Sequence, residues 1–250
     1  MPETDGTYAL FLDFDGTLVD IVERPDAVVV DPGLPEILTR LEQRLGGALA
    51  IISGRPVEFL DGRFVPHEFD MAGLHGLEHR IAGQLSMCDP VDHPALRAMV
   101  GRLREIVAGK EGILIEDKGC SVAIHWRLAP HEKEFALATA QAAVEALGSD
   151  YRVQHGKAVA EILPSAAGKG KVIERFLHET PYKGRCPIFV GDDLTDENGF
   201  KIVNAHGGLS VRIGAGETIA KVRLGTPAEL RHCLSTWAFE GSLPFKGDDC

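Results

Sequence analysis

Two aspartates, Asp13 and Asp15, stand one residue apart at the end of an apolar segment, directly before Gly16. In an extended strand, residues i and i+2 face the same side, so both carboxylates would meet while Phe14 points into the core. Carboxylates this close repel each other unless a cation bridges them or one of them holds a proton. We therefore expect a metal-bound nucleophile beside a general acid, although a lone Asp-x-Asp pair is more often a solvated strand end.

A second group of carboxylates, Asp192, Asp193 and Asp196, follows another apolar segment. The carboxyl ends of parallel strands are where α/β sheets place their ligands. Hard oxygen ligands gathered from two strand ends suit Mg²⁺. An aspartate at the start of a helix is also a common N-cap, and this alternative stays open for Thr195 and Asp196.

Two segments between the acidic groups have features of phosphate-binding loops. Ser53, Gly54 and Arg55 follow an apolar segment. Pro56 is expected to be the first residue of a helix, so a hydroxyl and backbone N–H groups can hold an anion there. Lys169 stands between two glycines at the start of another helix, although a surface lysine is the commoner case. Neither a Walker-type nor a Rossmann-type glycine motif is present, so we expect no nucleotide site of those kinds.

Apolar segments and helix signals place these residues in an α/β framework. Strands are expected at residues 8–15, 48–52, 187–191 and 208–213, and helices from Pro32 with Asp31 as N-cap, from Lys169, from Asp196, and from Thr226, which opens a capping box with Glu229. Strands that alternate with helices through short links are typical of a parallel sheet with crossover helices. The predicted fold class is α/β, with a doubly wound, mostly parallel sheet.

The middle of the chain has a different pattern. Helices are expected at residues 94–107 and 130–147, with one hairpin of strands 112–119 and 120–126 and a second hairpin around His155 and Gly156. Hairpins combined with helices are typical of an α+β domain. We therefore predict a core of residues 1–82 and 166–250, interrupted by an inserted α+β domain at residues 83–165.

The composition is that of an ordinary folded protein. Of 250 residues, 44% are hydrophobic and 25% are charged, which excludes disorder over most of the chain. The formal net charge of −11 argues against nucleic acid and an anionic membrane surface as the main partners, but not against a small anionic substrate in a pocket. No segment reaches the roughly 18–20 apolar residues of a membrane span.

The cysteines and the N-terminus bear on the compartment. The first residues are acidic and do not resemble a signal peptide. The cysteines are odd in number and form no Cys-x-x-Cys: Cys88, Cys120, Cys186, Cys233 and Cys250. We expect free, mostly buried thiols and a cytoplasmic protein. We also expect a monomer.

Four motifs occur in order along the chain: Asp13-x-Asp15-Gly16-Thr17, Ser53, Lys169, and Gly191-Asp192-Asp193-x-x-Asp196. Together they resemble motifs I to IV of the haloacid-dehalogenase-like (HAD) superfamily, specifically its phosphatases. The inserted middle agrees with this resemblance, because an insertion between the second and third motifs is a C2-type cap in that superfamily. The resemblance thus implies a HAD core with an α+β cap.

Three further segments, residues 73–78, 115–127 and 161–170, carry the sequences Gly-Leu-His-Gly-Leu-Glu, Ile-Glu-Asp-Lys-Gly-x-Ser-Val-Ala-Ile-His-x-Arg, and Glu-Ile-x-Pro running to Lys169-Gly170. They are similar to signatures of the trehalose-6-phosphate phosphatase family, and the resemblance covers residues 8–235. The sequence departs from the family at Trp126, where Tyr is expected. This departure concerns the packing of the cap and leaves the catalytic residues untouched.

The resemblance implies a Mg²⁺-dependent phosphatase that hydrolyses trehalose 6-phosphate through an aspartyl-phosphate. Asp13 is then the nucleophile and Asp15 the general acid and base. The implied ligands of Mg²⁺ are the Asp13 carboxylate, the Asp15 carbonyl and Asp192. The other implied roles are substrate binding by Ser53, Gly54, Arg55, His75, Glu116, Lys118, Glu161 and Lys169, and support of the site by Thr17, Asp193 and Asp196.

The cap residues and the histidine have simpler explanations on the sequence alone. Glu116 and Lys118 flank a hairpin turn, where both side chains can be solvated. Glu161 alternates with apolar residues, as the polar face of a strand does. His75 stands between Gly73 and Gly76 and can be a core histidine. The family resemblance favours sugar binding, because the family uses Glu116, Lys118 and Glu161 to grip sugar hydroxyls.

Other functions stay open. A different sugar-phosphate phosphatase with the same cap, for sucrose-phosphate or mannosyl-phosphoglycerate, is the nearest alternative. A non-catalytic sugar-phosphate sensor needs neither the nucleophile Asp13 nor the acid Asp15, so their presence weighs against it. A dehalogenase is disfavoured because Asp15 and the Mg²⁺ carboxylates are what phosphoryl transfer requires. In each remaining case the partner is a small sugar phosphate.

Overall fold

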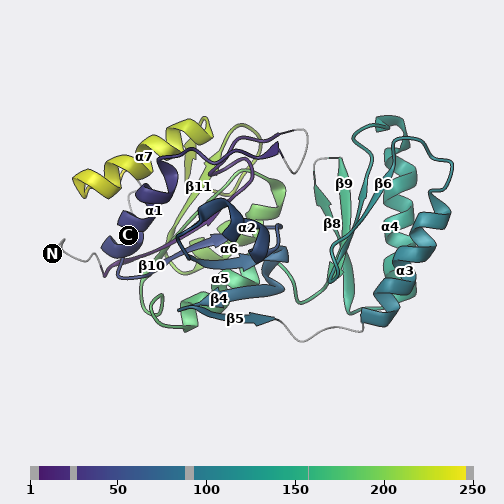
Figure 1. Cartoon of the computed structure of the whole chain (residues 1–250), viewed down its shortest axis with the longest axis horizontal. Helices are drawn as coiled ribbons and strands as arrows, with labels where there is room; N and C mark the ends of the chain where they lie inside the picture. Colours follow the sequence, from purple (N-terminus) through teal and green to yellow (C-terminus); the bar gives the residue numbers. More distant parts are fainter. Residues whose placement is uncertain (1–5, 23–26, 88–92, 157, 246–250) are drawn as a thin grey trace. The chain divides into compact units, whose positions relative to one another are not determined.

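The computed structural model describes residues 6–22, 27–87, 93–156 and 158–245 (Figure 1). The chain divides into two compact units, Met1–Ser86 with Lys169–Cys250 and Met87–Gly168. We call them the core unit and the cap unit. The predicted first boundary at residue 83 falls too early, because β5 (Gln84–Met87) is still a strand of the core sheet. All four residues of β5 are exposed, so no apolar alternation marks this strand in the sequence.

The core unit is built around an eight-stranded sheet. Its strands lie in the order β12 (Val222–Leu224), β11 (Leu209–Ile213), β10 (Cys186–Gly191), β1 (Tyr8–Asp13), β2 (Leu49–Ile52), β3 (Asp70–Gly73), β4 (Glu78–Ile81) and β5. Neighbours from β12 to β3 pair in parallel, and β4 pairs antiparallel to β3. The prediction of an α/β fold with a mostly parallel sheet is confirmed.

Helices cover both faces of this sheet: α1 (Leu34–Arg44), α2 (Val57–Phe64), α5 (Lys169–His178), α6 (Glu197–Ala205) and α7 (Pro227–Glu240). Strand β1 shows the two faces, because residues an odd number apart point to opposite sides. The Tyr8 ring lies 6.2 Å from Trp237 of α7, whereas the Phe11 ring lies 5.8 Å from Phe176 of α5. Helices α7 and α5 therefore pack on opposite faces, and Asp13 shares the side of Phe11.

The chain order indicates the end of β1 as the place where a ligand would bind. From β1 the chain continues to β2 and β3 on one side, while β10, β11 and β12 follow one another on the other side. The direction of strand addition thus reverses next to β1. In open α/β sheets, ligands bind at this reversal, beyond the carboxyl ends of the strands. Asp13 ends β1 and Asp192 follows β10, so both lie at this edge.

The cap unit contains a four-stranded antiparallel sheet in the order β6 (Leu114–Asp117), β7 (Val122–His125), β9 (Val159–Pro164) and β8 (Tyr151–Gly156). One sheet face packs on α3 (His93–Ile106) and α4 (Lys133–Leu147) through a separate core that includes Leu103, Val122, Ile124, Ala140 and Ile162. Both predicted hairpins are confirmed, as β6 with β7 and β9 with β8.

Several local predictions need correction. Helix α1 begins at Leu34 and not at Pro32, because the Asp31 carboxylate accepts a hydrogen bond from the N–H of Gly33 (2.8 Å) in the turn before the helix. At α7, Thr226 caps the N–H of Glu229 (3.2 Å) as predicted, but Glu229 reaches the N–H of Gly225, so half of the capping box is confirmed. Strand β12 was not predicted, since three residues are too short for a periodic signal.

The cysteines differ from expectation. Cys120 and Cys233 are free, as predicted, but only half-buried. Cys186 is disulfide-bonded, so the prediction of a free thiol is wrong there. Cys88 and Cys250 lie outside the described residues. Within the described ranges, none of the helices combines the length and apolarity that crossing a membrane requires.

Candidate active site

Lys169 joins two acidic groups that are far apart in the sequence. Its Nζ lies 2.5 Å from Oδ1 of Asp13 and 2.6 Å from Oδ1 of Asp196. All three side chains are buried. Lys169 is the first residue of α5, on the sheet face that Asp13 shares, so the helix start and the strand end hold this contact. The structure thus brings together three of the residues singled out in the sequence.

The loop after β10 is organised by Asp196. Its Oδ2 accepts hydrogen bonds from the N–H groups of Asp192 (3.0 Å) and Asp193 (2.9 Å). Asp193 in turn caps the N–H of Leu194 (2.7 Å). Asp196 stands at the N-cap position of α6, as the alternative for this residue supposed, but its side chain makes no cap hydrogen bond to that helix. Asp193 caps the turn before α6, and the Asp196 side chain holds that turn and Lys169. Asp192 is left facing Asp13.

Gly16 allows Asp192 to approach the end of β1. Gly16 has φ +84°, and a Cβ there would collide with the Asp192 carboxylate. The Thr17 hydroxyl, which is buried, lies 3.4 Å from Oδ1 of Asp192, a long hydrogen bond. Glycine is therefore required at position 16, because the segments that follow β1 and β10 pack closely there.

Burial shapes the electrostatics of this cluster. Burial raises the pKa of Asp13, and the ammonium of Lys169 opposes that rise. Burial also raises the pKa of Asp192 to about 6, with a contribution from the charge of Asp196. For Lys169, burial by itself lowers the pKa, but Asp13 and Asp196 outweigh it and hold the pKa above its ordinary value. Lys169 consequently stays charged.

The donor set fits a divalent cation. Ligand oxygens of Asp13, Asp192 and Asp196 lie within 4.8 Å of one another. Three ionised carboxylates beside one ammonium leave an excess of two negative charges in a buried place, which is costly without a counter-ion. Because Asp196 is engaged by Lys169 and two backbone N–H groups, Asp13 and Asp192 are the side chains left to hold Mg²⁺.

Asp15 has a partner that the sequence did not suggest. Its two carboxylate oxygens accept hydrogen bonds from Nε and an Nη of Arg55, both at 2.8 Å. Asp15 also lies beyond the end of β1, so the predicted strand to residue 15 is two residues too long. Arg55, predicted to bind substrate, thus engages the predicted general acid in a bidentate ion pair, a geometry that fixes both side chains.

The loop after β2 holds Ser53, which is buried. Its Oγ accepts a hydrogen bond from the N–H of Arg55 (3.1 Å), so its own hydrogen is available to another acceptor. Pro56 is the N-cap of α2 and not its first helical residue. The first helical N–H, at Val57, already donates to the Glu78 carboxylate. The prediction that this helix start holds the substrate's phosphate therefore needs correction.

His75 lies beside the Ser53 loop. Its ring packs on Gly54, where a Cβ would lie 2.8 Å from Nε2 of His75. The N–H of His75 donates to the carbonyl of Ser53 (3.0 Å). These contacts are with the Ser53 loop itself, so they favour a supporting role for His75 over direct substrate binding. Glycine is likewise required at position 54, because a Cβ there would collide with the His75 ring.

In the cap unit, the three predicted sugar-binding residues share the sheet face opposite the helices. Lys118 lies 3.2 Å from Glu161, and the Ser121 hydroxyl donates to Glu161 (2.6 Å). Glu116 contacts Nε2 of His125 at 2.8 Å. Strand register accounts for this, because Glu116 and Glu161 are both paired with Ala123 of β7. The hairpins therefore gather the polar side chains that the sequence predicted to converge.

Three residues at these sites were not predicted: Ser121, His125 and Glu78. Ser121 and His125 flank Ala123 at a spacing of two along β7, so the strand period places them on the polar face. That alternation was the available signal. The contact of Glu78 with Val57 joins segments 21 positions apart, and no local pattern indicates it.

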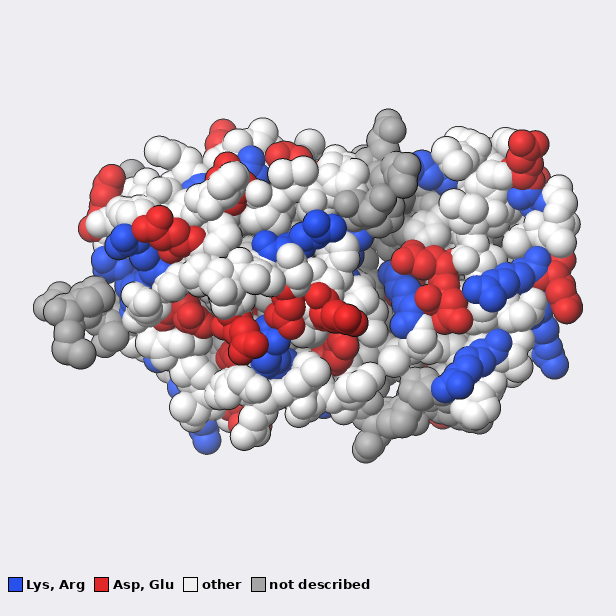
Figure 2. All heavy atoms as spheres, viewed as in Figure 1, with Lys and Arg blue, Asp and Glu red and all other residues white. Residues whose placement is uncertain are grey.

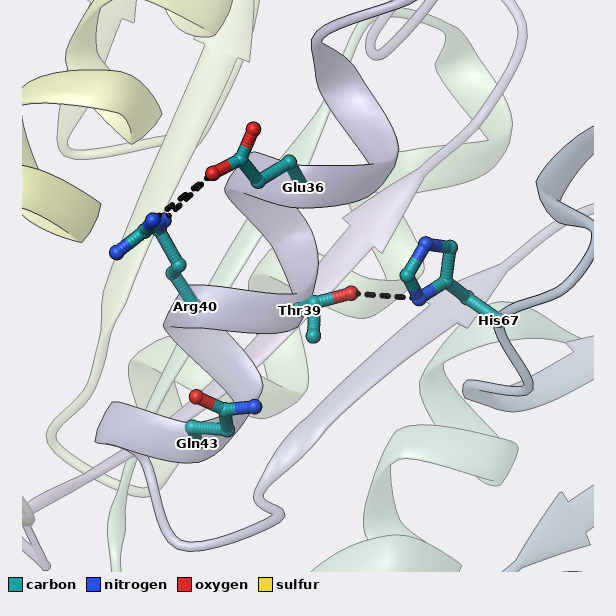
Figure 3. Close-up of a pocket in the computed structure, with 5 residues that line it drawn as sticks. All are labelled: Glu36, Thr39, Arg40, Gln43 and His67. Atoms are coloured by element: carbon teal, nitrogen blue, oxygen red, sulfur yellow. Dashed lines mark hydrogen bonds and ion pairs between the residues drawn. The ribbon is translucent and has the colours of Figure 1, made fainter.

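A pocket of about 360 Å³ lies elsewhere on the core unit, against α1 (Figure 3). It is lined by Glu36, Thr39, Arg40, Gln43 and His67. Its polar groups pair with one another, Glu36 with Arg40 and Thr39 with His67 (Figure 3). None of the predicted site residues lines it, so the site is the strand-end cluster and not this pocket.

Comparison with known proteins agrees with this geometry. The family model described as trehalose-phosphatase matches residues 11–227. A probable trehalose-phosphate phosphatase of Sinorhizobium fredii is 46% identical over 209 residues, covering 83% of this chain and 78% of that protein. The trehalose-6-phosphate phosphatase of Escherichia coli is 42% identical over 228 residues, covering 90% and 85%.

Solved structures show the same fold. The crystal structure of a trehalose-6-phosphate phosphatase related protein has a TM-score of 0.75 and 27% identity, and the match covers 93% of this chain and 98% of that one. A haloacid dehalogenase-like hydrolase from Bacteroides thetaiotaomicron, 14% identical, shares the fold with a TM-score of 0.66 over 91% of this chain and 98% of its own. The chain therefore belongs to the trehalose-phosphatase family, a family of phosphatases with a HAD-like fold.

Proposed function

We propose that this protein hydrolyses trehalose 6-phosphate to trehalose and inorganic phosphate, with Asp13 as the nucleophile. The observation that carries the proposal is the Asp13 carboxylate, which ends β1 beside Asp192 and is held by Lys169 at 2.5 Å. The names of the relatives at 42% and 46% identity supply the substrate. The alternative of a sensor is disfavoured, because binding alone requires no buried nucleophile.

The reaction has two displacements. An oxygen of Asp13 attacks phosphorus, the bond from phosphorus to the sugar oxygen breaks, and that oxygen takes a proton from Asp15. Water then attacks phosphorus, Asp15 accepts its proton, and the bond to Asp13 breaks to release phosphate. Lys169 binds Oδ1 of Asp13, which opposes the rise that burial causes in the pKa of that carboxyl and orients the side chain. Ser53 offers its free hydroxyl hydrogen to a phosphoryl oxygen.

Arg55 changes partners in this scheme. While Nε and an Nη of Arg55 donate to Asp15, both oxygens of this carboxylate are engaged by the guanidinium. Asp15 must carry a proton to act as the acid, so this ion pair has to open. The phosphoryl group is an anion that offers Arg55 replacement acceptors. We propose that arrival of the substrate releases Asp15 in this way.

Asp13, Asp192 and the backbone carbonyl of Asp15 are the proposed ligands of Mg²⁺. When bound, Mg²⁺ neutralises phosphoryl charge and fixes the in-line geometry. Use of the Asp15 carbonyl leaves its side chain free for proton transfer. Asp196 keeps Lys169 and the Asp192 loop in place through the contacts described above.

Glu116, Lys118 and Glu161 are the proposed sugar-binding residues. Carboxylates accept hydrogen bonds from sugar hydroxyls, and the ammonium of Lys118 donates one. A sugar with differently placed hydroxyls would leave some of these groups unpaired, which is how such a site discriminates.

We further propose that the protein acts in the cytoplasm, since a charged sugar phosphate stays in the compartment where it is made. We also propose that it acts as a monomer.

A panel of sugar phosphates tests the proposal. Phosphate release is measured from trehalose 6-phosphate, sucrose 6-phosphate, mannosyl-3-phosphoglycerate and p-nitrophenyl phosphate, each with Mg²⁺ and with EDTA. The expected result is Mg²⁺-dependent release, with the highest kcat/KM for trehalose 6-phosphate. A higher value for another sugar phosphate would replace the substrate, and binding without any release would favour the sensor.

A further inference from the structure

Residues 73–78, which we call the bracing segment, support the Ser53 loop through the backbone. The N–H of Leu74 donates to the carbonyl of Arg55, and the N–H of His75 donates to the carbonyl of Ser53, both at 3.0 Å. Leu74 and His75 have φ of +48° and +58°, in the left-handed region that non-glycine residues rarely adopt. Strained residues persist where surrounding contacts determine them, which marks this segment as built for position.

The bracing segment packs on two sides. On one side, the His75 ring lies against Gly54 of the Ser53 loop. On the other side, Gly76 (φ +93°) lies against Val172 of α5, so closely that a Cβ would be 2.8 Å from the Val172 Cβ. Helix α5 begins at Lys169. One short segment therefore contacts both elements that supply phosphate-binding side chains.

Glu78, the last residue of the segment, caps α2. The N-cap Pro56 makes no side-chain hydrogen bond, and Oε1 of Glu78 accepts the first helical N–H, at Val57. A carboxylate at a helix N-terminus is favoured by the helix dipole. At Gly73, a Cβ would lie 2.5 Å from Oε1 of Glu78 and 2.7 Å from the nitrogen of Val57, so only glycine permits this approach. Burial raises the pKa of Glu78, and the Val57 hydrogen bond opposes that rise.

Strand β4 holds α2 at a second point. Arg80 donates to both oxygens of Asp61 (2.9 and 2.6 Å) and to the carbonyl of Phe69 (3.0 and 2.8 Å). Asp61 lies one turn after Val57, away from the Ser53 loop. The contact of Glu78 with Val57 and the contact of Arg80 with Asp61 differ in one respect. Glu78 acts on the helix end that continues the loop, whereas Arg80 acts on the helix body.

We propose that Glu78 is a positioning residue for phosphoryl transfer, which fixes the start of α2 and with it Ser53 and Arg55. The inference rests on the proposed function for the roles of Ser53 and Arg55. Removing the acceptor leaves the N–H of Val57 without its partner and lets the loop shift. A misplacement near 1 Å in a phosphate-binding loop costs up to about a hundredfold in rate.

The test compares Glu78→Ala with Glu78→Gln and with Asp61→Ala. The last variant removes the carboxylate that Arg80 binds on α2. Glu78→Ala is expected to lower kcat about tenfold or more on both trehalose 6-phosphate and p-nitrophenyl phosphate, since both share the phosphoryl group. Glu78→Gln keeps an acceptor and is expected to restore most of the rate. Asp61→Ala is expected to lower Tm at least as much as Glu78→Ala while kcat stays within about twofold.

Two measurements without turnover keep the inference separable from the proposed function. Hydrogen exchange at the Val57 amide should be faster in Glu78→Ala and near wild type in Glu78→Gln. The Kd of inorganic phosphate with Mg²⁺ should rise in Glu78→Ala alone. If the wild type hydrolyses no phosphate ester, the proposed function fails, and these two results still decide the inference. Unchanged exchange and phosphate affinity in Glu78→Ala, or equal losses of kcat in Glu78→Ala and Asp61→Ala, would overturn it.

Discussion

The contacts of Lys169 show that the aspartates of this site have different roles. Its ammonium binds one oxygen of Asp13 and one of Asp196, while the second oxygen of Asp196 holds the backbone of the Asp192 loop. Lys169 thereby holds the Asp13 carboxylate in one orientation, while Asp196 fixes the loop that carries Asp192. Among the described residues, the Asp192 carboxylate makes a long contact with the Thr17 hydroxyl and lies beside Asp13, so it is the carboxylate proposed to bind a cation.

Asp13→Asn should abolish turnover while the fold persists. An amide cannot form the acyl-phosphate, so we expect a loss of at least about a thousandfold in kcat. Circular dichroism and Tm check that the protein is folded, and trapping of wild type with BeF₃⁻ should place the analogue on Asp13. Turnover within about tenfold of wild type would refute Asp13 as the nucleophile.

The loss of activity on removal of the metal should be reversible, and the Mg²⁺ concentration required for activity should depend on Asp192. EDTA is expected to eliminate phosphate release and Mg²⁺ to restore it. In Asp192→Asn, the Mg²⁺ concentration for half-maximal activity should rise about tenfold or more, because an amide is a weaker ligand than a carboxylate. Asp193→Asn is the matched control, since asparagine caps Leu194 equally well. Full activity after rigorous chelation would contradict metal dependence.

At the scale of elements, strand ends and register determine which side chains meet. The carboxyl ends of β1 and β10 gather the carboxylates, and α5 contributes Lys169 at its first residue. In the cap unit, the register of β6, β7 and β9 sets Glu116 and Glu161 on one face. A shift of one residue in either pairing would turn one of these side chains toward the helices.

Glu161→Ala should distinguish recognition of the sugar from binding of the phosphoryl group. Loss of a charged hydrogen-bond partner costs on the order of 1.5–3 kcal/mol, so kcat/KM for trehalose 6-phosphate should fall about ten- to a hundredfold. Activity on p-nitrophenyl phosphate, which has no sugar, should change little. Glu116→Ala and Lys118→Ala should behave alike, and Glu145→Ala, on the exposed side of α4, serves as the control. Equal losses on both substrates would mean that these residues only support the cap fold.

Across the whole molecule, charge is distributed without a dominant patch on the face shown in Figure 2, where acidic and basic side chains both appear over the core and cap units. In the core unit, the half-buried Glu42 lies near the buried Asp70. Burial and the nearby charge of Asp70 raise the pKa of Glu42 to about 7. Asp70 itself accepts a hydrogen bond from the Tyr182 hydroxyl (2.8 Å).

This pair predicts a pH dependence of stability. The pKa of Glu42 is higher in the folded state than in the unfolded state, so the folded state binds its proton more tightly. The contribution to stability is present below about pH 4.5 and is lost as pH rises through about 7. Glu42→Gln should therefore gain unfolding free energy relative to wild type between pH 5 and pH 8, on the order of 1 kcal/mol after allowance for solvent screening. Urea denaturation at both pH values measures it, and a constant difference would contradict the shift.

Much of the site follows from local patterns. Apolar runs closed by Asp13 and by Asp192 predicted strand ends in an α/β sheet, and the order of the motifs predicted the phosphatase family, which the comparisons confirm. Strand alternation likewise predicted a polar cap face with Glu161. These features depend on neighbours in sequence, where the period of a strand and the chemistry of a side chain suffice.

Other features required the tertiary structure. That Arg55 binds Asp15 and that Glu78 occupies the start of α2 are contacts between segments 40 and 21 positions apart. Each of these side chains has several acceptable partners, and local sequence does not rank them. The choice is made when packing brings particular strand ends and helix ends together, because buried charges and N–H groups must then find partners among the groups that are present.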